Sequence, residues 1–591
     1  MKGPSIQIYR MNGPFIVVAI CHVPPSRFVI SVTGRGARDR RGDARGRGRC
    51  PRGGAGSHPD GTVAGMIQTA MRAARRRPAV SGRQAGGRRG GGRGTHLGHW
   101  TFMFGEIAAY SFAVLAVTGF FLLVFYEPSM ERTGYHGSYA TLRGVSMSEA
   151  YASTLRISFD VRGGLLIRQI HHWAALIFVA AVTLQLLRMF FTGAFRRPRT
   201  RNWQIWILLL ILGMAAGVTG TILPDDMLSG GSLALIQGVT QSIPVVGSYV
   251  TLWLFGGEIP GQAIIFRMYW VHLIVSMVMV ILFVIRYRLL RRYGHSQFGS
   301  PRPAELPVRV GAVRTGVVAS FLTTCGVLAL LGAVAQINPI WLYGPYQPGS
   351  ISAGSVPGWY MGFLDGALRI MPSWEFVVGG HTVTPAVFIP ALVIPGGFFL
   401  LLATYPAFER WATGDRQLHH VLDRPRNTAT RTALGVAGVT FYGVLWAAAA
   451  NDQIASNFHV SLFAVTGFFR LAVLAGPPIA FVLTQRICLG LQRRDLRTAL
   501  RGVETGIVRR LPDGGYLEDV QPPAEPLPAG PLGPGDGPDR EASGRLQAAA
   551  RRFYRVDLAR VPQADLARVR QADLARDDHP TARPMPPTGE K

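Results

Sequence analysis

The sequence predicts an all-α integral membrane protein with eight transmembrane helices. Of its 591 residues, 48% are hydrophobic, and these residues gather in runs of about 20, the length that spans a bilayer as a helix. The eight runs lie at 104–125, 170–192, 203–224, 264–285, 316–335, 383–405, 431–450 and 461–484. Arg470 interrupts the last run.

The distribution of charge indicates how the expected helices are oriented. The formal net charge is +29, but the arginines lie before the first span, in alternate connections and after the last span. These connections are 195–201, 286–295 and 423–431, whereas the opposite ones at 223–226, 255–258 and 451–453 contain few basic residues. This asymmetry is the positive-inside pattern of a multi-pass plasma-membrane protein. It predicts that both termini are cytoplasmic, and it favours anionic lipid over nucleic acid as the partner of the loop arginines.

The chain divides by composition into four segments. We expect a disordered Arg/Gly-rich extension at 1–95, two four-helix membrane domains at 96–300 and 301–490, and a cytoplasmic Pro/Gly-rich tail with DLAR repeats at 491–591. An apolar patch at 15–21 is too short for a signal peptide. The four cysteines (Cys21, Cys50, Cys325 and Cys488) form neither a CxxCH motif nor a metal-binding cluster.

Two of the expected membrane helices have a histidine near the same end. One helix opens with RQIHHWAAL, which contains His171, and another with RMYWVH, which contains His272. Arg168 and Arg267 precede these histidines, at a depth where a charge without a partner is costly. The two carboxylates on the edge of a haem would pair with such arginines. The pattern therefore predicts a haem between the two histidines, in a bundle made by the first four spans.

Glycines recur where a flat macrocycle would need a close approach of the backbone. Gly105 and Gly119 lie on the first span, and Gly220 lies on the third. Ordinary packing of small residues between helices explains the glycines equally well, but it does not explain the arginines.

From His99 to Arg494 the chain resembles cytochrome b of the cytochrome bc1 complex, actinobacterial type. The motifs that support the resemblance are HWTFMFGEIAAYSFAVLAVTGFF, RQIHHWAAL, GTILPDDMLSGG, SIPVVGSYVTLWLFGGE, WYMGFLDGALRIMP and GHSQF. The resemblance implies two stacked b-type haems, each held by two histidines. It also implies quinol oxidation at an outer site, with menaquinol as the quinol, and partner subunits that carry a Rieske iron–sulfur centre and cytochrome c.

The resemblance assigns roles to residues around the outer haem. His171 and His272 match its iron ligands, Arg168 and Arg267 match the partners of its propionates, and Gly119 and Gly220 match its packing glycines. His172 is one position out of register, so we expect it to be a neighbour of the haem and not a ligand.

The inner haem of the family has no matching ligands in this chain. Family members have a second histidine fourteen residues after the first, about 20 Å further along each helix. Here those positions are Gln185 and Arg286, neither of which is a plausible axial ligand. Trp206 stands where the family has a glycine, although Gly105 and Arg188 are kept. We therefore expect one b-type haem instead of two.

The outer quinol site also departs from the family pattern. The family has an acid before a Trp-Tyr pair, whereas residues 357–360 read PGWY. Trp359 and Tyr360 match the pair, but Gly358 offers no general base. Asp365 and Glu375 are the nearest acids, and neither is placed by the motif.

Two functions remain open at the level of the sequence. The first is that of a cytochrome b subunit in a quinol–cytochrome c oxidoreductase, which transfers electrons in the respiratory chain. The alternative is a degenerate paralogue with one haem or none, which has a structural or assembly role and does not oxidise quinol. A transporter is not supported, because the sequence has no inverted repeat and no paired broken helices.

Overall fold

The structure is a computed structural model that describes residues 100–298, 310–350, 358–501, 503–510, 512, 516–521 and 544–555. The extension at 1–95, Pro357 and the three DLAR repeats lie outside these residues, so the expectations for them stay predictions.

The expected membrane spans are all helical. They correspond to α2 (Met103–Phe125), α4 (Gly164–Phe191), α5 (Thr200–Ile222), α8 (Ile264–Tyr293), α9 (Val310–Val334), α13 (Ile394–Thr413), α14 (Ala429–Ala448) and α16 (Leu462–Arg501). Among the described residues, seven helices are long and apolar enough to cross a membrane, including α13 together with α12 (Pro385–Phe388) and η5 (Ile389–Val393). The eighth candidate is α14 with α15 (Asn451–Phe458), a pair bent by 60°. The all-α membrane fold is confirmed.

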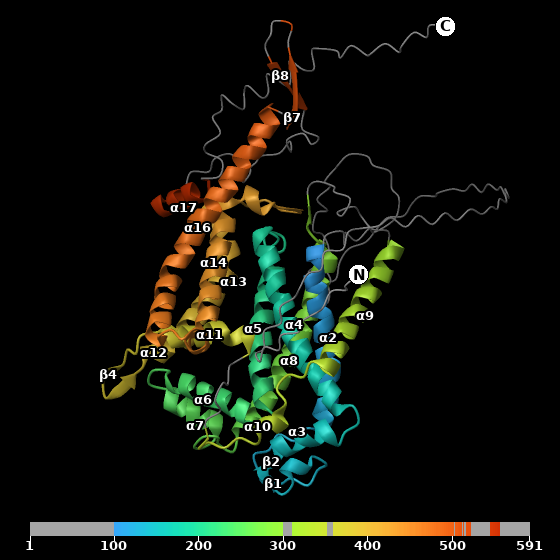
Figure 1. The fold of residues 1–591 in the computed structure, drawn as a ribbon, viewed down its shortest axis with the longest axis vertical. Helices are drawn as coiled ribbons and strands as arrows, with labels where there is room; N and C mark the ends of the chain where they lie inside the picture. The colour runs from blue at the N-terminus through green and yellow to red at the C-terminus, as the bar shows by residue number, and fades with distance from the viewer. Residues whose placement is uncertain are drawn as a thin grey trace, which may run out of the picture. The chain divides into compact units, whose positions relative to one another are not determined.

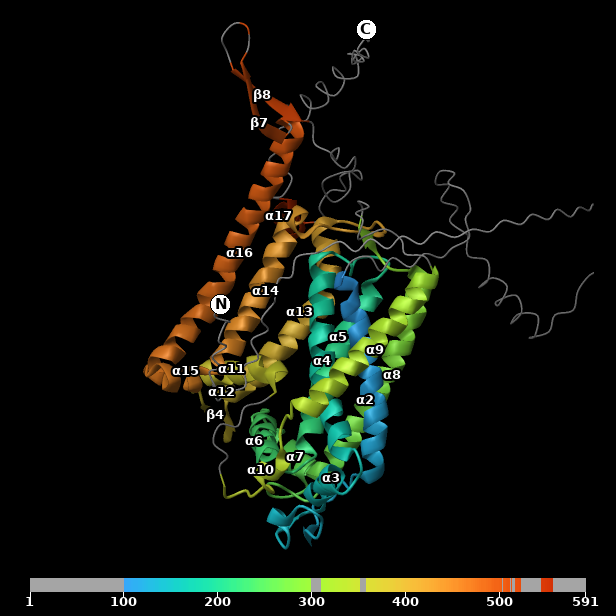
Figure 2. The same cartoon turned by 45° about the vertical axis from the view of Figure 1, so that its right-hand side comes forward.

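The first four spans form a bundle of two helix pairs. Helix α2 packs against α4, α5 packs against α8, and α4 joins the pairs through its contact with α5. Figures 1 and 2 show these helices running alongside one another. Helix α9 follows residue 300 in the sequence, yet it lies against α4 and α2. Gly332 allows this approach, because a Cβ there would be 3.0 Å from the backbone nitrogen of Ile170.

The later spans pack around the short helix α11 (Gly362–Ile370), which contacts both α14 and α16. Gly366 permits the contact with α14, because a Cβ at that position would be 1.7 Å from the Leu445 carbonyl oxygen. Arg470, the charge in the last span, donates from Nε to the carbonyl of Ile370 at 2.8 Å. That bond satisfies a carbonyl at the end of α11, which accounts for an arginine in an apolar helix.

The connections at one end of the bundle contain several short elements (Figure 1). Ser148 and Asp226 start α3 and α6 as N-caps, accepting from the amides of Tyr151 and Ser229. The elements are β1 (Arg132–Gly134) antiparallel to β2 (Ser146–Ser148), η2 (Ala140–Leu142), α3 (Glu149–Phe159), α6 (Met227–Gln241), α7 (Gly247–Phe255), α10 (Ile340–Tyr343), η4 (Trp359–Met361), and β4 (Phe376–Val378) antiparallel to β5 (His381–Val383).

The opposite end has its own short elements. These are η1 (Trp100–Phe102), β3 (Gln297–Phe298) parallel to β6 (Val421–Leu422), η6 (Pro425–Asn427), β7 (Val503–Arg510) antiparallel to β8 (Tyr516–Gln521), and α17 (Arg545–Arg555). The tail after residue 490 thus includes a hairpin and a helix before its repeats.

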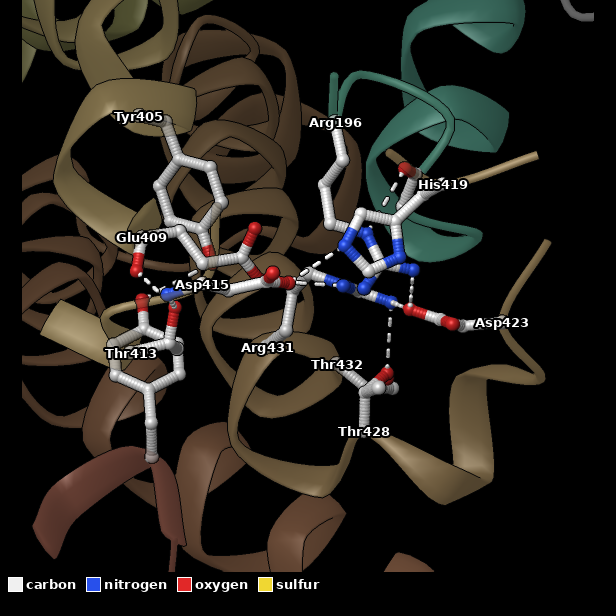
Figure 3. Close-up of polar contacts among 12 residues, drawn as sticks. Arg196, Tyr405, Glu409, Thr413, Asp415, His419, Asp423, Thr428, Arg431 and Thr432 are labelled. Carbon is white, nitrogen blue, oxygen red and sulfur yellow. Dashed lines mark hydrogen bonds and ion pairs between the residues drawn. The ribbon is translucent and has the colours of Figure 1, made fainter. Parts of the chain in front are cut away.

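A buried ion-pair network at this second end joins the two halves of the chain (Figure 3). The side chain of Arg431 is 3% exposed and pairs with Glu409 at 3.2 Å and with Asp423 at 2.6 Å. Arg196, from the connection between α4 and α5, pairs with the same Asp423 carboxylate. The sequence suggested lipid as the partner of the arginines in these connections. For Arg196 and Arg431 this is wrong, because carboxylates of the chain itself neutralise them.

Candidate functional site

The two predicted haem ligands face each other across the first bundle. His171 of α4 and His272 of α8 have ring centroids 6.5 Å apart, with the ring planes inclined by 55°. Two imidazoles on opposite sides of one metal would be separated by roughly 6 Å, since each metal–nitrogen bond is about 2 Å long. Of the two adjacent histidines it is His171, as the fourteen-residue register predicts, that faces His272.

Two threonines hold the predicted ligand histidines in the orientation that metal binding would require. The Thr118 hydroxyl donates to the Val114 carbonyl at 2.7 Å. It is therefore an acceptor for Nδ1–H of His171, 2.9 Å away. This bond keeps the proton on Nδ1 and leaves the lone pair on Nε2 for a metal.

The second histidine is held in the same way. Nδ1 of His272 lies 3.1 Å from the Thr219 hydroxyl and 2.9 Å from the Ala216 carbonyl, which can only accept. Each threonine is 53 positions from its histidine. Sequence reasoning missed both threonines, although each lies next to a predicted glycine position on α2 or α5: Thr118 precedes Gly119, and Thr219 precedes Gly220. The repeated Thr-Gly dipeptide was the available signal.

The predicted packing glycines lie against the histidine rings. A Cβ at Gly119 would be 3.2 Å from Cε1 of His171, and a Cβ at Gly220 would be 3.0 Å from Cε1 of His272. Any larger side chain at either position would push the imidazole away from its threonine. The glycines therefore set the position of the two histidine rings.

The predicted propionate partners, Arg168 and Arg267, have buried hydrogen-bond donors. Within the described part of the chain, Nε and Nη2 of Arg168 and Nη1 of Arg267 are buried without a hydrogen-bond partner. Their guanidinium groups lie 6.0 Å from the Trp341 ring and 5.2 Å from the Trp253 ring. Unpaired buried donors of a cation are costly. Two anionic carboxylates at this position would satisfy them, so the residues present fit a haem.

The inner haem position contains side chains instead. A Cβ added at Gly105 would be 3.4 Å from Arg286 Nη2, from Gln185 Oε1 and from Trp206 Cζ2. The Trp206 side chain is fully buried, and the Arg286 guanidinium lies 4.5 Å from the centre of its ring. The three substituted positions thus meet at one place, as the resemblance to cytochrome b implied.

The space left at the inner position is small. A cavity of about 50 Å³ remains there, lined by Glu106, Gln185, Arg188 and Arg286 among others. Sites for drug-sized ligands and cofactors occupy roughly 300–1,000 Å³. With these side chains in place, the inner position offers no pair of axial ligands and only this small space.

The Trp-Tyr pair of the expected quinol site lies close to the histidine pair. Tyr360 of η4 is buried, and its hydroxyl would be 2.4 Å from a Cβ at Gly217 of α5, one turn before Gly220. The Trp359 carbonyl accepts from Nε1 of Trp446 at 3.0 Å. These contacts fix the pair against α5 and α14.

No acid takes the place of Gly358 in this part of the described structure. A Cβ at Gly358 would be 2.9 Å from Cε1 of Tyr360, so an acid there would require the tyrosine ring to move. Asp365 is paired with Arg369 at 3.0 Å, and Glu375 is exposed on the connection before β4.

Two buried carboxylates, to which the sequence assigned no role of their own, lie beyond the end of α5. Oδ2 of Asp225 accepts a hydrogen bond from the Ser148 hydroxyl at 2.6 Å. Two other oxygens, Oδ1 of Asp225 and Oδ2 of Asp226, are buried without a partner among the described residues. Burial raises the pKa of Asp225 to about 6. The adjacent acids in LPDD were the available signal, but neither burial nor the Ser148 contact can be read from it.

Comparison with known proteins gives consistent matches. The family model described as Cytochrome b(N-terminal)/b6/petB matches residues 176–345. The cytochrome bc1 complex cytochrome b subunit of Streptomyces coelicolor is 46% identical over 486 residues, which cover 79% of this chain and 89% of that protein. The subunits of the same name from Mycobacterium leprae and Mycobacterium tuberculosis (strain H37Rv) are 48% identical over 432 residues, covering 72% of this chain and 78% of each relative.

Proposed function

The chain belongs to the family of cytochrome bc1 complex cytochrome b subunits, and we propose that it is a membrane electron-transfer subunit with a single b-type haem. The observation that carries the proposal is the facing pair of His171 and His272, with each Nδ1 held by a hydrogen bond. Gln185 and Arg286 at the inner position, beside a buried Trp206, support one haem instead of two.

Each residue around the histidine pair has a distinct task in this proposal. His171 and His272 bind the iron through Nε2, while Thr118 and Thr219 keep the rings in that tautomer. Arg168 and Arg267 pair with the propionates. A bound haem supplies reversible one-electron transfer.

At the outer site, Trp359 and Tyr360 form one wall of the quinol pocket. Tyr360 is the polar group of this wall, and its position against Gly217 brings it within one helical turn of Gly220. Gly358 cannot take a proton from quinol, so we expect oxidation of menaquinol to be slower than in relatives with an acid at this position.

The family also supports the partners and the orientation. The proposed partners are a Rieske iron–sulfur subunit and a cytochrome c subunit, which would receive electrons on the outer side. The arginine-rich connections support cytoplasmic positions for both termini and for the 195–202 and 406–430 connections.

The test is purification of the tagged full-length chain from membranes that contain the partner subunits. We expect the Rieske and cytochrome c subunits to co-purify, and menaquinol to reduce the b-type haem. His272→Ala is the control, because it removes one ligand. A haem that dithionite reduces but menaquinol does not, in a chain that purifies without a Rieske subunit, would overturn the proposal and favour the degenerate paralogue.

A further inference from the structure

We propose that α17 is an interfacial helix whose outer face binds the anionic headgroup layer of the membrane. This inference concerns the tail of the chain and is independent of haem binding. It depends on the depth at which the helix lies, on the residues that it leaves uncovered, and on its charge.

The contacts of α17 place it at the level where the spans end. Tyr554 Oη is 3.1 Å from Tyr405 Oη, and Tyr405 lies two turns inside the end of α13. The Phe553 ring stacks on Phe481 at 5.7 Å and 9°, and Phe481 lies within the apolar run at 461–484. A helix beside residues of the spans themselves is at the depth of the headgroups and the upper acyl chains.

The orientation of α17 agrees with this depth. Figure 1 shows the helix lying across the ends of α13 and α14 instead of continuing their direction. Gln547 donates from Nε2 to the Trp411 carbonyl at 2.9 Å, and Thr430 donates from its hydroxyl to the Phe553 carbonyl at 3.2 Å. These bonds, at opposite ends of α17, tie it to two different spans, α13 and α14.

One face of α17 is left uncovered by the described part of the chain. The residues on this face are Arg545, Leu546, Ala549 and Arg552, spaced as neighbours on one side of a helix. Leu546 is 80% exposed. A large apolar side chain between two arginines is the composition of a face that inserts among lipid headgroups.

The charge of the helix favours an anionic lipid surface over water or an apolar protein surface. The sequence RLQAAARRFYR contains four arginines and no acid. Arg551 lies beside Gly414, at the carbonyl end of α13, whereas Arg545 and Arg552 are exposed. Each basic residue near an anionic membrane surface strengthens attachment by roughly fivefold.

The test measures where the uncovered face lies in lipid. Cys21, Cys50, Cys325 and Cys488 are changed to serine in the full-length chain, and a nitroxide is attached through Ala549→Cys. The protein is placed in nanodiscs of phosphatidylglycerol or of phosphatidylcholine. Collisions with oxygen, which concentrates in lipid, are compared with collisions with a water-soluble nickel chelate. A label through Ile507→Cys on β7, which is 57% exposed, serves as the reference position.

We expect the label at position 549 to favour oxygen in phosphatidylglycerol discs, while the label at position 507 favours nickel in both lipids. In phosphatidylglycerol discs, the double change R545Q and R552Q should lower the oxygen preference of the label at position 549 to the value that it has in phosphatidylcholine discs. R509Q with R510Q, two arginines on β7, should leave it unchanged. Nickel access at position 549 in both lipids would show that the helix lies in water. Exclusion of both reagents would show that protein covers the face. Either result overturns the proposal.

Discussion

The outer and inner positions of the first bundle are built on the same four helices at the same spacing, yet they contain different side chains. At the outer position two histidines face each other, two glycines admit their rings, and two arginines have buried donors to offer. At the inner position, Gln185 and Arg286 replace the ligands and Trp206 occupies the volume. Loss of ligands and closure of the space therefore occur together.

The inner position also shows how such a bundle stays packed without a cofactor. The Arg286 guanidinium lies over the Trp206 ring, and that of Arg188 lies 3.8 Å from the centre of the Phe102 ring. Cation–π contacts of this kind contribute about 0.5–2 kcal/mol each. The aromatic rings and long arginine side chains fill the interior that a porphyrin would otherwise occupy.

The largest expected effect is on haem binding, when one side chain is removed from each of the two positions in turn. His272→Ala should abolish the b-haem absorbance, because one imidazole alone does not hold the iron from both sides. Arg286→Ala, on the same helix fourteen residues later, should leave the absorbance at its wild-type value. Reduced-minus-oxidised spectra of the purified variants check both. Equal losses in the two variants would mean that the positions do not differ in ligation.

The next effect is the gain of a second haem. Gln185→His, Arg286→His and Trp206→Gly together should supply two ligands and the space for the ring, and a redox titration should show a second b-haem. The histidine pair without Trp206→Gly should not bind it, because cores resist overpacking. A second haem in the double-histidine protein would show that Trp206 does not block the site.

Restoring an acid at the quinol site requires a change of the local structure as well as a substitution. Gly358→Asp places a carboxyl where the family has one, but its Cβ would meet the Tyr360 ring at 2.9 Å. The structure indicates that Tyr360 must move before the acid can act.

The sequence predicted the spans well because a membrane helix requires a continuous run of about 20 apolar residues. The resemblance to cytochrome b also placed Gln185, Trp206 and Arg286 at one position, because each lies fourteen residues from an outer-haem residue on its own helix. Thr118 and Thr219 were missed despite the repeated Thr-Gly dipeptide, since a threonine in an apolar helix most often bonds to its own backbone. The pairing of Arg196 with Asp423 and the docking of α17 depend on contacts between segments far apart in the chain, which local patterns do not encode.

A smaller effect contrasts the carboxylates at the two ends of the membrane domain. Burial raises the pKa of Asp225 from 3.8 to about 6, against the bond from Ser148. Its contribution to stability is therefore complete below pH 4 and is lost as the pH rises through about 6, by up to roughly 3 kcal/mol. Asp225→Asn should remove this loss of stability. Thermal unfolding midpoints of the variant and the wild type, measured between pH 4 and pH 8, would show the difference. The same dependence on pH in both proteins would contradict the prediction.

Asp423 provides the matched variant with the opposite sign. Burial alone would raise its pKa, but the guanidinium groups of Arg431 and Arg196 hold the pKa below its ordinary value. Its stabilisation is present above the ordinary carboxyl pKa and is lost as the pH falls. Asp423→Asn should therefore destabilise the protein at neutral pH, where Asp225→Asn stabilises it.

The smallest effect concerns the threonines behind the ligands. Thr118→Val removes the acceptor for Nδ1–H of His171, and such losses reduce metal affinity by about 10–100-fold. Thr219→Val should cost less, because the Ala216 carbonyl still accepts from His272. Thr183→Val, whose hydroxyl bonds only to the Val179 carbonyl of its own helix, is the control. Haem transfer to apomyoglobin measures the difference, and equal transfer from all three variants would contradict it.

The most direct test of a single haem position is the ratio of haem to protein. A pyridine haemochrome assay on the purified full-length chain, with the protein quantified by amino-acid analysis, should give one b-type haem per chain, bound between His171 and His272. A ratio of two would contradict the account, because it would require the second haem to bind where Gln185, Trp206 and Arg286 now meet.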